Sequence, residues 1–247
     1  MQPSEYKTLA NHEENHWWFV SKRLLVKQCI EQYAPQIPSD LYLLDLGCGT
    51  GANLTLARSL TPKAYGFDIS VHALRYSYQK HTNHVGQASL FALPIADNSV
   101  DLITILDVLY HQWISNDTIV LKEIYRVLKP GGVMICLDAA FSFLAGHHDK
   151  INLAARRYNL PELHAKLTEV GFVIEKVSYV YALLFPIVFI WRNFQGIFMK
   201  NNPATSDVQS IPMWLNMLMI KLIRLELAWL KFNDLAIGTS VLFVARK

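Results

Sequence analysis

Apolar and polar residues alternate along the first 140 residues in blocks that predict strands and helices in turn. Short continuous apolar runs, typical of strands buried on both faces, occupy 41–46, 64–67, 102–106 and 133–137, with a weaker run near 85–88. Segments with apolar residues at helical spacing lie between them at 52–60, 71–80 and 118–127. This alternation predicts a doubly wound parallel sheet that binds ligands at the carboxyl ends of its strands.

The pattern outside this region is more apolar and less regular. An amphipathic helix is predicted at 17–34, with the basic residues Lys22, Arg23 and Lys27 on its polar face. After residue 137 the pattern predicts a helix, a strand, an apolar run, a long helix and a last strand, at 161–169, 172–180, 181–191, 213–232 and 240–245. The apolar run is shorter than the roughly 20 residues that a spanning helix needs. The long helix carries four charged residues, so neither segment is expected to cross a membrane.

The composition favours an apolar binding site or contact with a membrane. Apolar residues make up 52% and charged residues 17% of the 247 residues, and the mean hydropathy is +0.18. A net charge of +3 is too small to indicate nucleic acid as a partner. Cys29, Cys48 and Cys136 have no C-x-x-C spacing, and the N-terminus lacks the layout of a signal peptide. We therefore expect free thiols in a reducing, cytoplasmic compartment.

The strongest chemical signal is a glycine-rich turn between the first strand and the helix that follows it. Gly47, Gly49 and Gly51 stand at every second position after the run Leu43-Leu44-Asp45-Leu46. Glycine permits positive φ and lets a ligand approach the backbone amides at the helix N-terminus. The turn alone also fits the G-x-G-x-x-G/A pattern of dinucleotide-binding proteins, so a nicotinamide-dependent oxidoreductase is an alternative at this point.

Two further segments favour a different cofactor. Residues 123–132 read E-I-Y-R-V-L-K-P-G-G, and residues 93–101 read L-P-I-A-D-N-S-V-D. Together with residues 43–51 they resemble class I S-adenosylmethionine (SAM) dependent methyltransferases of the methyltransferase type 11 group. The resemblance implies a Rossmann-like, doubly wound, seven-stranded α/β sheet and SAM as cofactor, with S-adenosylhomocysteine as its product. The oxidoreductase alternative explains neither Asp45 nor the turn at 126–132.

The resemblance also assigns residues to the cofactor. Asp45 is expected near its methionine end, Asp68 on the ribose hydroxyls and Ile69 on the adenine. Ser89 stands where the group usually has an acid that accepts from the adenine amino group, and the Leu90 amide could bind the ring nitrogen. The candidate cofactor-binding residues are Asp45, Gly47, Cys48, Gly49, Asp68, Ile69, Ser89, Leu90, Asp107, Val108, Trp18 and Arg23.

Two histidines are candidates for the acceptor side of the site. His111 follows the buried strand at 102–106 and is the better candidate for a general base, since histidine titrates near neutral pH. His148 is the second candidate. A base is needed only where the acceptor must lose a proton, so methylation of an oxygen is the expected reaction. His147, His148 and Asp149 define no ligand geometry for a metal, and none is expected.

The two ends of the chain resemble a subgroup associated with bacterial envelope glycan and lipid genes. The resemblance lies in H-W-W-F at 16–19, H-D at 148–149 with R-R-Y at 156–158, and G-T-S at 238–240. It implies a small-molecule, glycan or lipid-linked acceptor. Trp18 could cover the cofactor, and Lys22 or Arg23 could pair with its carboxylate.

The predicted organisation has four parts. They are a helical lid at 1–38, a SAM-binding domain at 39–180, an apolar helical insertion at 181–238 and the last strand of the sheet at 239–247. The insertion is expected to form the acceptor pocket, to rest on a membrane surface or to join two copies in a homodimer. A non-catalytic SAM-binding scaffold is the remaining alternative.

Overall fold

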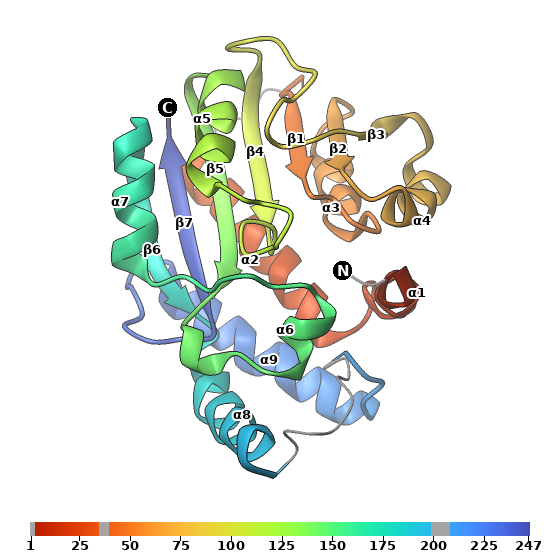
Figure 1. Ribbon diagram of the computed structural model, residues 1–247, viewed down its shortest axis with the longest axis vertical. Helices are drawn as coiled ribbons and strands as arrows, with labels where there is room; N and C mark the ends of the chain where they lie inside the picture. The colour runs from red at the N-terminus through yellow and green to blue at the C-terminus, as the bar shows by residue number, and fades with distance from the viewer. Residues whose placement is uncertain (1–2, 35–39, 199–207) are drawn as a thin grey trace.

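A computed structural model describes residues 3–34, 40–198 and 208–247 of the chain. The predicted boundary between residues 38 and 39 lies outside the described residues. Seven strands form one sheet (Figure 1). They are β1 Leu43–Leu46, β2 Ala64–Asp68, β3 Val85–Gln87, β4 Val100–Leu106, β5 Leu128–Ala139, β6 Val173–Val180 and β7 Ser240–Arg246.

The strand order is β3-β2-β1-β4-β5-β7-β6. The first five strands are parallel, and β7 runs antiparallel between β5 and β6. Strand order reverses between β1 and β4. The connections that leave the carboxyl ends of these two strands therefore run to opposite sides, which opens a crevice for a ligand. The predicted doubly wound, seven-stranded sheet is confirmed.

Nine helices are found in the described parts of the chain. They are α1 Pro3–His12, α2 Trp17–Tyr33, α3 Ala52–Leu60, α4 Val71–His81, α5 Asp117–Val127, α6 His147–Ile151, α7 Leu160–Val170, α8 Phe185–Phe198 and α9 Met213–Leu230. Within the predicted helical lid at 1–38 a helix was specified at 17–34, and α1 is a further helix in the polar stretch before residue 16. Its acidic first-turn residue Glu5 and its last-turn residue His12 suit the helix dipole.

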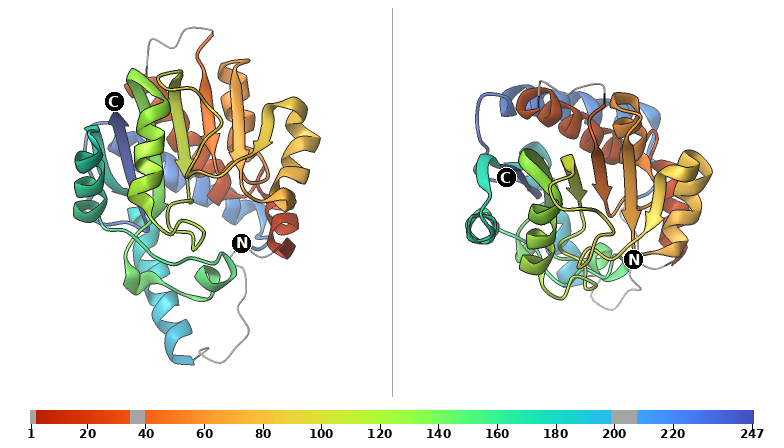
Figure 2. Two further views of the ribbon diagram at one scale, coloured as in Figure 1. Left: turned by 45° about the horizontal axis from the view of Figure 1, so that its top comes forward. Right: turned by 90° about the horizontal axis from the view of Figure 1, so that it is seen from above.

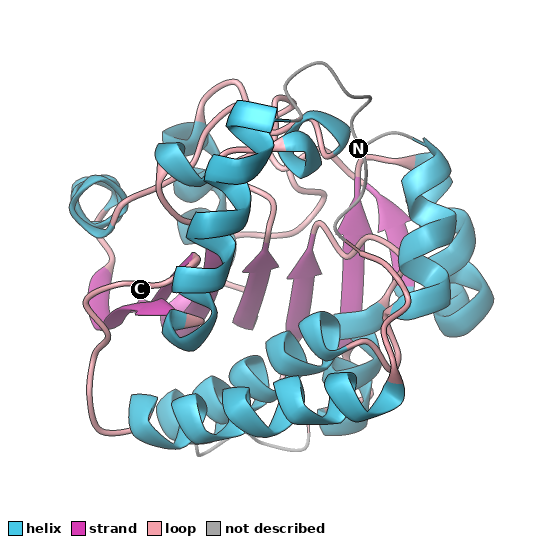
Figure 3. Ribbon diagram, turned by 90° about the horizontal axis from the view of Figure 1, so that it is seen from below, coloured by secondary structure: helices cyan, strands magenta, loops and turns pink. Residues whose placement is uncertain are grey.

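Two apolar layers cover the two faces of the sheet. One layer includes Val120 and Ile124 of α5 with Leu163 and Leu167 of α7. The other layer combines α2, α3 and α9, which are far apart in sequence. Helices α2 and α9 lie side by side across that face (Figures 2 and 3). Helix α9, which lies within the predicted insertion at 181–238, is therefore packed against the sheet.

The segment Pro130–Gly132 departs from its predicted role as a turn between α5 and the next strand. Strand β5 already begins at Leu128, opposite Val100, and pairing resumes at Val133 opposite Leu102. The intervening residues bulge out of the ladder, with Gly131 at a φ of 81°. Proline has no amide hydrogen to donate to the ladder, which suits it to such a bulge.

Candidate cofactor and acceptor site

A cavity of about 1050 Å³ lies at the carboxyl ends of β1, β2 and β4. Its walls include the segments 47–50, 68–70 and 106–108, which follow these three strands. Residues of α1, α2 and α8 complete it. Its volume lies at the upper end of the usual range for ligand pockets.

The glycine turn forms one wall of the cavity. Gly47, Gly49 and Gly51 have φ angles of 73°, 55° and 94°, so each needs the left-handed region that glycine enters without strain. A Cβ on Gly47 would also come within 2.3 Å of a methyl of Val108. The Gly47 amide donates to the Phe67 carbonyl at 2.7 Å, which fixes the turn against β2.

Asp68 is held in one orientation at the end of β2. Its Oδ2 accepts from the Gly49 amide at 2.9 Å, and its Oδ1 accepts from the Ser70 amide at 2.8 Å. Burial raises the pKa of Asp68, and the two amide hydrogen bonds oppose that shift. Ile69 lines the cavity beside it with 52% of its side-chain surface exposed. Both residues therefore lie where the sequence places them, on the cavity wall.

Asp45 lies behind the turn and is absent from the cavity wall. Its Oδ1 accepts from the Thr104 hydroxyl at 2.7 Å, while its buried Oδ2 has no partner. Burial raises the pKa of Asp45 to about 7. A buried oxygen without a donor is rare in proteins, and a ligand that brings a donor would satisfy it.

The segment after β4 presents Asp107, Val108 and His111 to the cavity. Asp107 has a φ of 57° and forms an ion pair with Lys22 of α2. Lys22 is only 7% exposed and lies 4.6 Å above the ring of Trp18, which also lines the cavity. Lys22 therefore lies at the site, although the helical pattern placed it on a polar face.

Arg23 points away from the cavity wall. Its guanidinium donates to the Glu13 carbonyl at 2.6 Å and to the Glu14 carbonyl at 2.7 Å. Of the two basic residues considered for the cofactor carboxylate, the structure brings Lys22 to the site and uses Arg23 to hold the chain between α1 and α2.

His111 lines the cavity in an apolar setting. Its ring stacks on Tyr110 at 5.4 Å, and its buried Nδ1 has no partner. Burial lowers the pKa of His111 to about 4, against a smaller opposing effect of Asp107. His111 is therefore neutral at neutral pH and has a nitrogen that can accept a proton.

His148 lines the cavity as well, on the short helix α6. Its Nε2 lies 2.7 Å from the Asn152 amide nitrogen, which donates to it. Arg157 nearby forms two hydrogen bonds with Asp149, at 2.8 and 3.1 Å. Within the described residues, no group of three or more His, Cys, Asp or Glu side chains could hold a metal.

The remaining candidates also lie on the cavity wall. Ser89 and Leu90 follow β3 and line it, as does Cys48 in the turn. Burial raises the pKa of the Cys48 thiol well above its usual value, which argues against a nucleophilic role.

Sequence reasoning missed the contribution of the segment before α2. Tyr6, Leu9 and Glu13 line the cavity. The carboxylate of Glu13 is 2% exposed and contacts both the Thr50 hydroxyl and the Lys80 ammonium. The polar composition of this segment gives no sign of this role, because the partners of Glu13 come from two distant helix ends.

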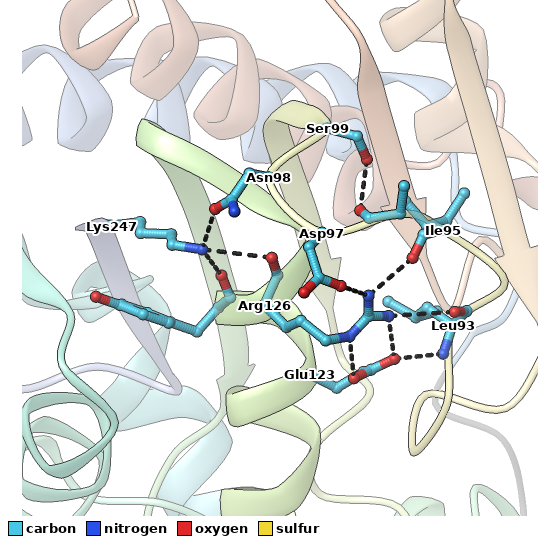
Figure 4. A network of polar contacts seen from close by, with 10 residues as sticks. Leu93, Ile95, Asp97, Asn98, Ser99, Glu123, Arg126 and Lys247 are labelled. Atoms are coloured by element: carbon cyan, nitrogen blue, oxygen red, sulfur yellow. Dashed lines mark hydrogen bonds and ion pairs between the residues drawn. The ribbon is translucent and has the colours of Figure 1, made fainter.

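The segment 93–101 and the motif at 123–132 bind each other away from the cavity (Figure 4). The Arg126 guanidinium donates to Glu123 at 2.7 and 2.8 Å, to the Ile95 carbonyl at 2.9 Å and to Asp97. Glu123 in turn accepts from the Leu93 amide at 2.6 Å. These residues fix the chain that follows Ser89 and Leu90, so their role is to position the site.

Comparisons with known proteins agree with this geometry. A methyltransferase domain family matches residues 44–136. A "Probable S-adenosylmethionine-dependent methyltransferase" of Mycolicibacterium smegmatis is 24% identical over 172 residues, which cover 68% of this chain and 64% of that protein. The demethylmenaquinone methyltransferase of Geobacillus stearothermophilus is 36% identical over 112 residues, 42% of this chain and 47% of the relative. The chain thus spans less than two thirds of the length of these relatives.

Solved structures share the fold. A SAM-dependent methyltransferase of Archaeoglobus fulgidus has a TM-score of 0.56 at 17% identity, covering 91% of this chain and 94% of that one. The Haemonchus contortus phosphoethanolamine N-methyltransferase 2, solved with SAM, has a TM-score of 0.57 at 17% identity over 88% of this chain and 51% of its own. The domain match, with the sheet order and the glycine turn, shows that this chain contains a class I SAM-dependent methyltransferase domain.

Proposed function

We propose that this protein transfers the methyl group of SAM to an oxygen of a small-molecule, glycan or lipid-linked acceptor. The observation that carries the proposal is the cavity itself. It joins a fixed carboxylate, Asp68, and a positive-φ glycine turn to a neutral histidine, His111, in one space.

The residues of the cavity fit SAM. Asp68 has its orientation fixed by two amides and faces the cavity, where it would accept from the ribose hydroxyls. Exposed Ile69 would pack on the adenine, with Ser89 and Leu90 nearby on the wall. Lys22 would pair with the carboxylate of the methionine part, and Trp18 would cover it. Asp45 lies behind the turn, and its Oδ2, which has no hydrogen-bond partner, would accept from a donor that reaches it there.

SAM supplies a methyl group on a positively charged sulfur. The sulfur is a good leaving group because it becomes a neutral thioether when the methyl is transferred. The protein then needs chiefly to align the acceptor and exclude water. A hydroxyl becomes strongly acidic as it is methylated. A weak base such as His111, with a pKa of about 4, can therefore remove its proton at that stage. His148, held by Asn152, is the second candidate for this step.

Part of the cavity wall is apolar and favours an acceptor with an apolar part. We call the part lined by Trp17, Leu184, Val188 and Trp191 the apolar end of the cavity. Relatives named demethylmenaquinone methyltransferases match 42% of this chain. We therefore place lipid-linked acceptors first among the three classes.

We also propose that residues 181–238 bring the protein to a membrane surface, with a homodimer through the same residues as the competing arrangement. Within the described residues no helix is long and apolar enough to cross a membrane.

Isothermal calorimetry of the purified protein with SAM, and with NAD as the control, tests the cofactor. Micromolar binding of SAM without binding of NAD would support the proposal, and the reverse would point to an oxidoreductase. Release of S-adenosylhomocysteine in the presence of hydroxyl-bearing lipids and glycans tests catalysis. Tight SAM binding without any release across these acceptor classes would favour the scaffold alternative.

A further inference from the structure

Helix α9 is apolar on two opposite sides. Its buried side carries Ile223, Leu227 and Leu230, which pack in the layer shared with α2 and the sheet. Its outer side carries large apolar residues with high exposure: Trp214 68%, Met217 53%, Leu218 44%, Leu225 67% and Trp229 60%. Phe232, two residues beyond the end of the helix at Leu230, is 86% exposed. We call this outer row, Trp214 to Phe232, the α9 stripe.

Met217 and Leu218 follow Trp214 by three and four residues, and Leu225 and Trp229 follow at helical spacing, so these members of the α9 stripe lie on one face of the helix. Exposed Lys221 lies on the same face, between Leu218 and Leu225. At about 1.5 Å per residue the stripe extends for roughly 27 Å. A soluble monomer rarely exposes a connected apolar surface of this size, which marks a site of interaction.

All exposed charges on α9 are positive. Lys221 and Arg224 lie within the stripe and are exposed. Glu226 is the one acidic residue of α9, and it is 5% exposed. Its carboxylate accepts from the Tyr181 amide and, at 3.0 Å, from the Leu183 amide. The stripe therefore combines tryptophan, aliphatic and basic side chains without an acid.

This combination fits an anionic lipid surface better than a second copy of the chain. Tryptophan and basic residues are typical of helices that lie in the interface of a bilayer, and each basic residue is attracted by anionic lipids. In a symmetric dimer the same face would meet itself. Lys221 and Arg224 of one copy would then face like charges near the centre of the contact.

One end of the α9 stripe adjoins the cavity. Asn216, in the first turn of α9, accepts from the Trp17 amide at 2.7 Å and donates to the Asn15 carbonyl at 2.9 Å. Trp17 lines the apolar end of the cavity, as does Ile211 just before α9. A surface that docks through the stripe would therefore lie next to the apolar end.

We infer that the α9 stripe docks onto an anionic lipid bilayer and that the acceptor enters the apolar end of the cavity from that bilayer. The docking surface stands on the stripe alone. The identity of the acceptor as a bilayer lipid rests on the proposed function.

Co-sedimentation with vesicles tests the docking. Vesicles of phosphatidylcholine alone are compared with vesicles of phosphatidylcholine and phosphatidylglycerol in equal parts. The protein should bind the anionic vesicles strongly and the neutral ones weakly. Replacing both Lys221→Gln and Arg224→Gln should weaken anionic binding about thirtyfold, because each cation contributes about a fivefold factor. Lys122→Gln, an exposed lysine on α5, is the matched control.

The apolar part is tested by Leu225→Gln with Trp229→Gln, which should weaken binding to both kinds of vesicle. Ile119→Gln, another exposed aliphatic residue on α5, should not. Equal binding of the wild type and both stripe variants would overturn the inference. So would a lack of vesicle binding together with a dimer, seen in sedimentation, that the stripe variants dissociate.

SAM calorimetry on the same samples separates the two proposals. Binding of SAM without binding of vesicles would overturn the docking, together with the proposed membrane contact of residues 181–238, and leave the proposed methyl transfer standing. Binding of vesicles without binding of SAM would do the reverse. A bilayer acceptor further requires that vesicles carrying the methylatable lipid support product release in the wild type and lose most of it in the stripe variants.

Discussion

At the scale of single residues, the site depends on side chains whose orientation is fixed before a ligand arrives. Asp68 is the clearest case, because two backbone amides hold its carboxylate. A pre-oriented group loses little conformational freedom on binding, so its hydrogen bonds add directly to affinity.

Asp68→Ala should therefore weaken SAM binding about a hundredfold, since it removes two hydrogen bonds to a charged acceptor. Calorimetry measures the affinity, and thermal unfolding checks that the variant is folded. Asp40→Ala, which removes an exposed carboxylate that pairs with Lys63, is the control. An unchanged affinity in Asp68→Ala would refute the role of Asp68 on the ribose.

His111 should give the protein a pH-dependent stability on the acid side. Its pKa is lowered by burial to about 4 in the folded state, below the unfolded value of about 6.5. Between these values the unfolded chain binds the proton first, so stability falls as the pH drops from about 6.5 to 4. The loss from His111 is of the order of 2 to 3 kcal/mol.

Urea unfolding of the wild type and His111→Gln at several pH values measures this contribution as a difference, which cancels the opposite trend of buried Asp45. The free energy of unfolding of the wild type should fall relative to that of His111→Gln as the pH drops from about 6.5 to 4. Parallel plots of unfolding free energy against pH would contradict the buried, neutral state of His111.

His111→Gln should also lose most methyl transfer while it keeps its SAM affinity, and full activity would remove His111 as the base.

At the scale of elements, α1 and the residue that directly follows it, Glu13, close the cavity through one buried carboxylate. Glu13 joins Thr50 in the glycine turn to Lys80 at the end of α4. Glu13→Gln keeps the shape and removes the charge that both partners use. SAM should then dissociate about tenfold faster, which corresponds to a loss of about 1.4 kcal/mol from a charged hydrogen-bond pair.

Stopped-flow fluorescence of SAM release measures this rate. Glu14→Gln is the matched control, because only the backbone carbonyl of Glu14 has a described hydrogen bond, to Arg23. Equal release rates in all three proteins would show that α1 does not retain the cofactor.

The network around Arg126 stabilises the chain that follows Ser89 and Leu90, the two residues predicted to contact the adenine. Arg126→Gln leaves the Leu93 and Ile95 carbonyls and Asp97 without their donor. We expect a loss of about 2 kcal/mol in the free energy of unfolding, measured in urea. Lys122→Gln on the same helix should stay within about 0.5 kcal/mol of the wild type, and an equal effect of the two changes would contradict the role of the network.

Helices and strands were predictable where the apolar residues recur with the period of the element and are also the residues that the fold buries. The helix at 52–60 and the strand ending at Asp68 were predicted from apolar runs and punctuating residues, and α3 and β2 confirm them. Helix α1 was not specified within the predicted lid, because much of its stability comes from contacts with α4 that a local pattern does not contain. The burial of Lys22 was missed for the same reason, since its partner Asp107 is 85 residues away.

Most of the candidate cofactor-binding residues come together in the structure, and two lie off the cavity wall. Gly47, Gly49, Asp68, Ile69, Ser89, Leu90, Asp107, Val108 and Trp18 line one cavity. Arg23 faces the chain between α1 and α2, while Asp45 is enclosed behind the turn. Period and spacing indicate which strand end carries a residue. Whether its side chain reaches the ligand depends on packing by distant segments.

At the scale of the whole molecule, the apolar segment before the last strand has two roles that sequence alone does not separate. Its helix α9 contributes Ile223, 0% exposed, to the core, and Leu225, 67% exposed, to the surface. Ile223→Ala should cost about 2 to 4 kcal/mol in the free energy of unfolding.

Leu225→Ala should cost less than about 0.5 kcal/mol. Denaturant titrations of both variants measure the contrast, and SAM affinity should stay unchanged in each. Similar costs at the two positions would mean that α9 does not pack on the sheet as described.

The position of β7 has a consequence for how the chain is made. This strand holds residues 240–246, yet it pairs with β5 on one side and β6 on the other. Before β7 is synthesised, β5 and β6 have both emerged from the ribosome, and each lacks its pairing with β7. Exposed strand edges invite pairing with other chains, and the apolar residues of α8 and α9 have emerged as well. We therefore expect the nascent chain to depend on protection from aggregation until β7 has emerged and can pair with β5 and β6.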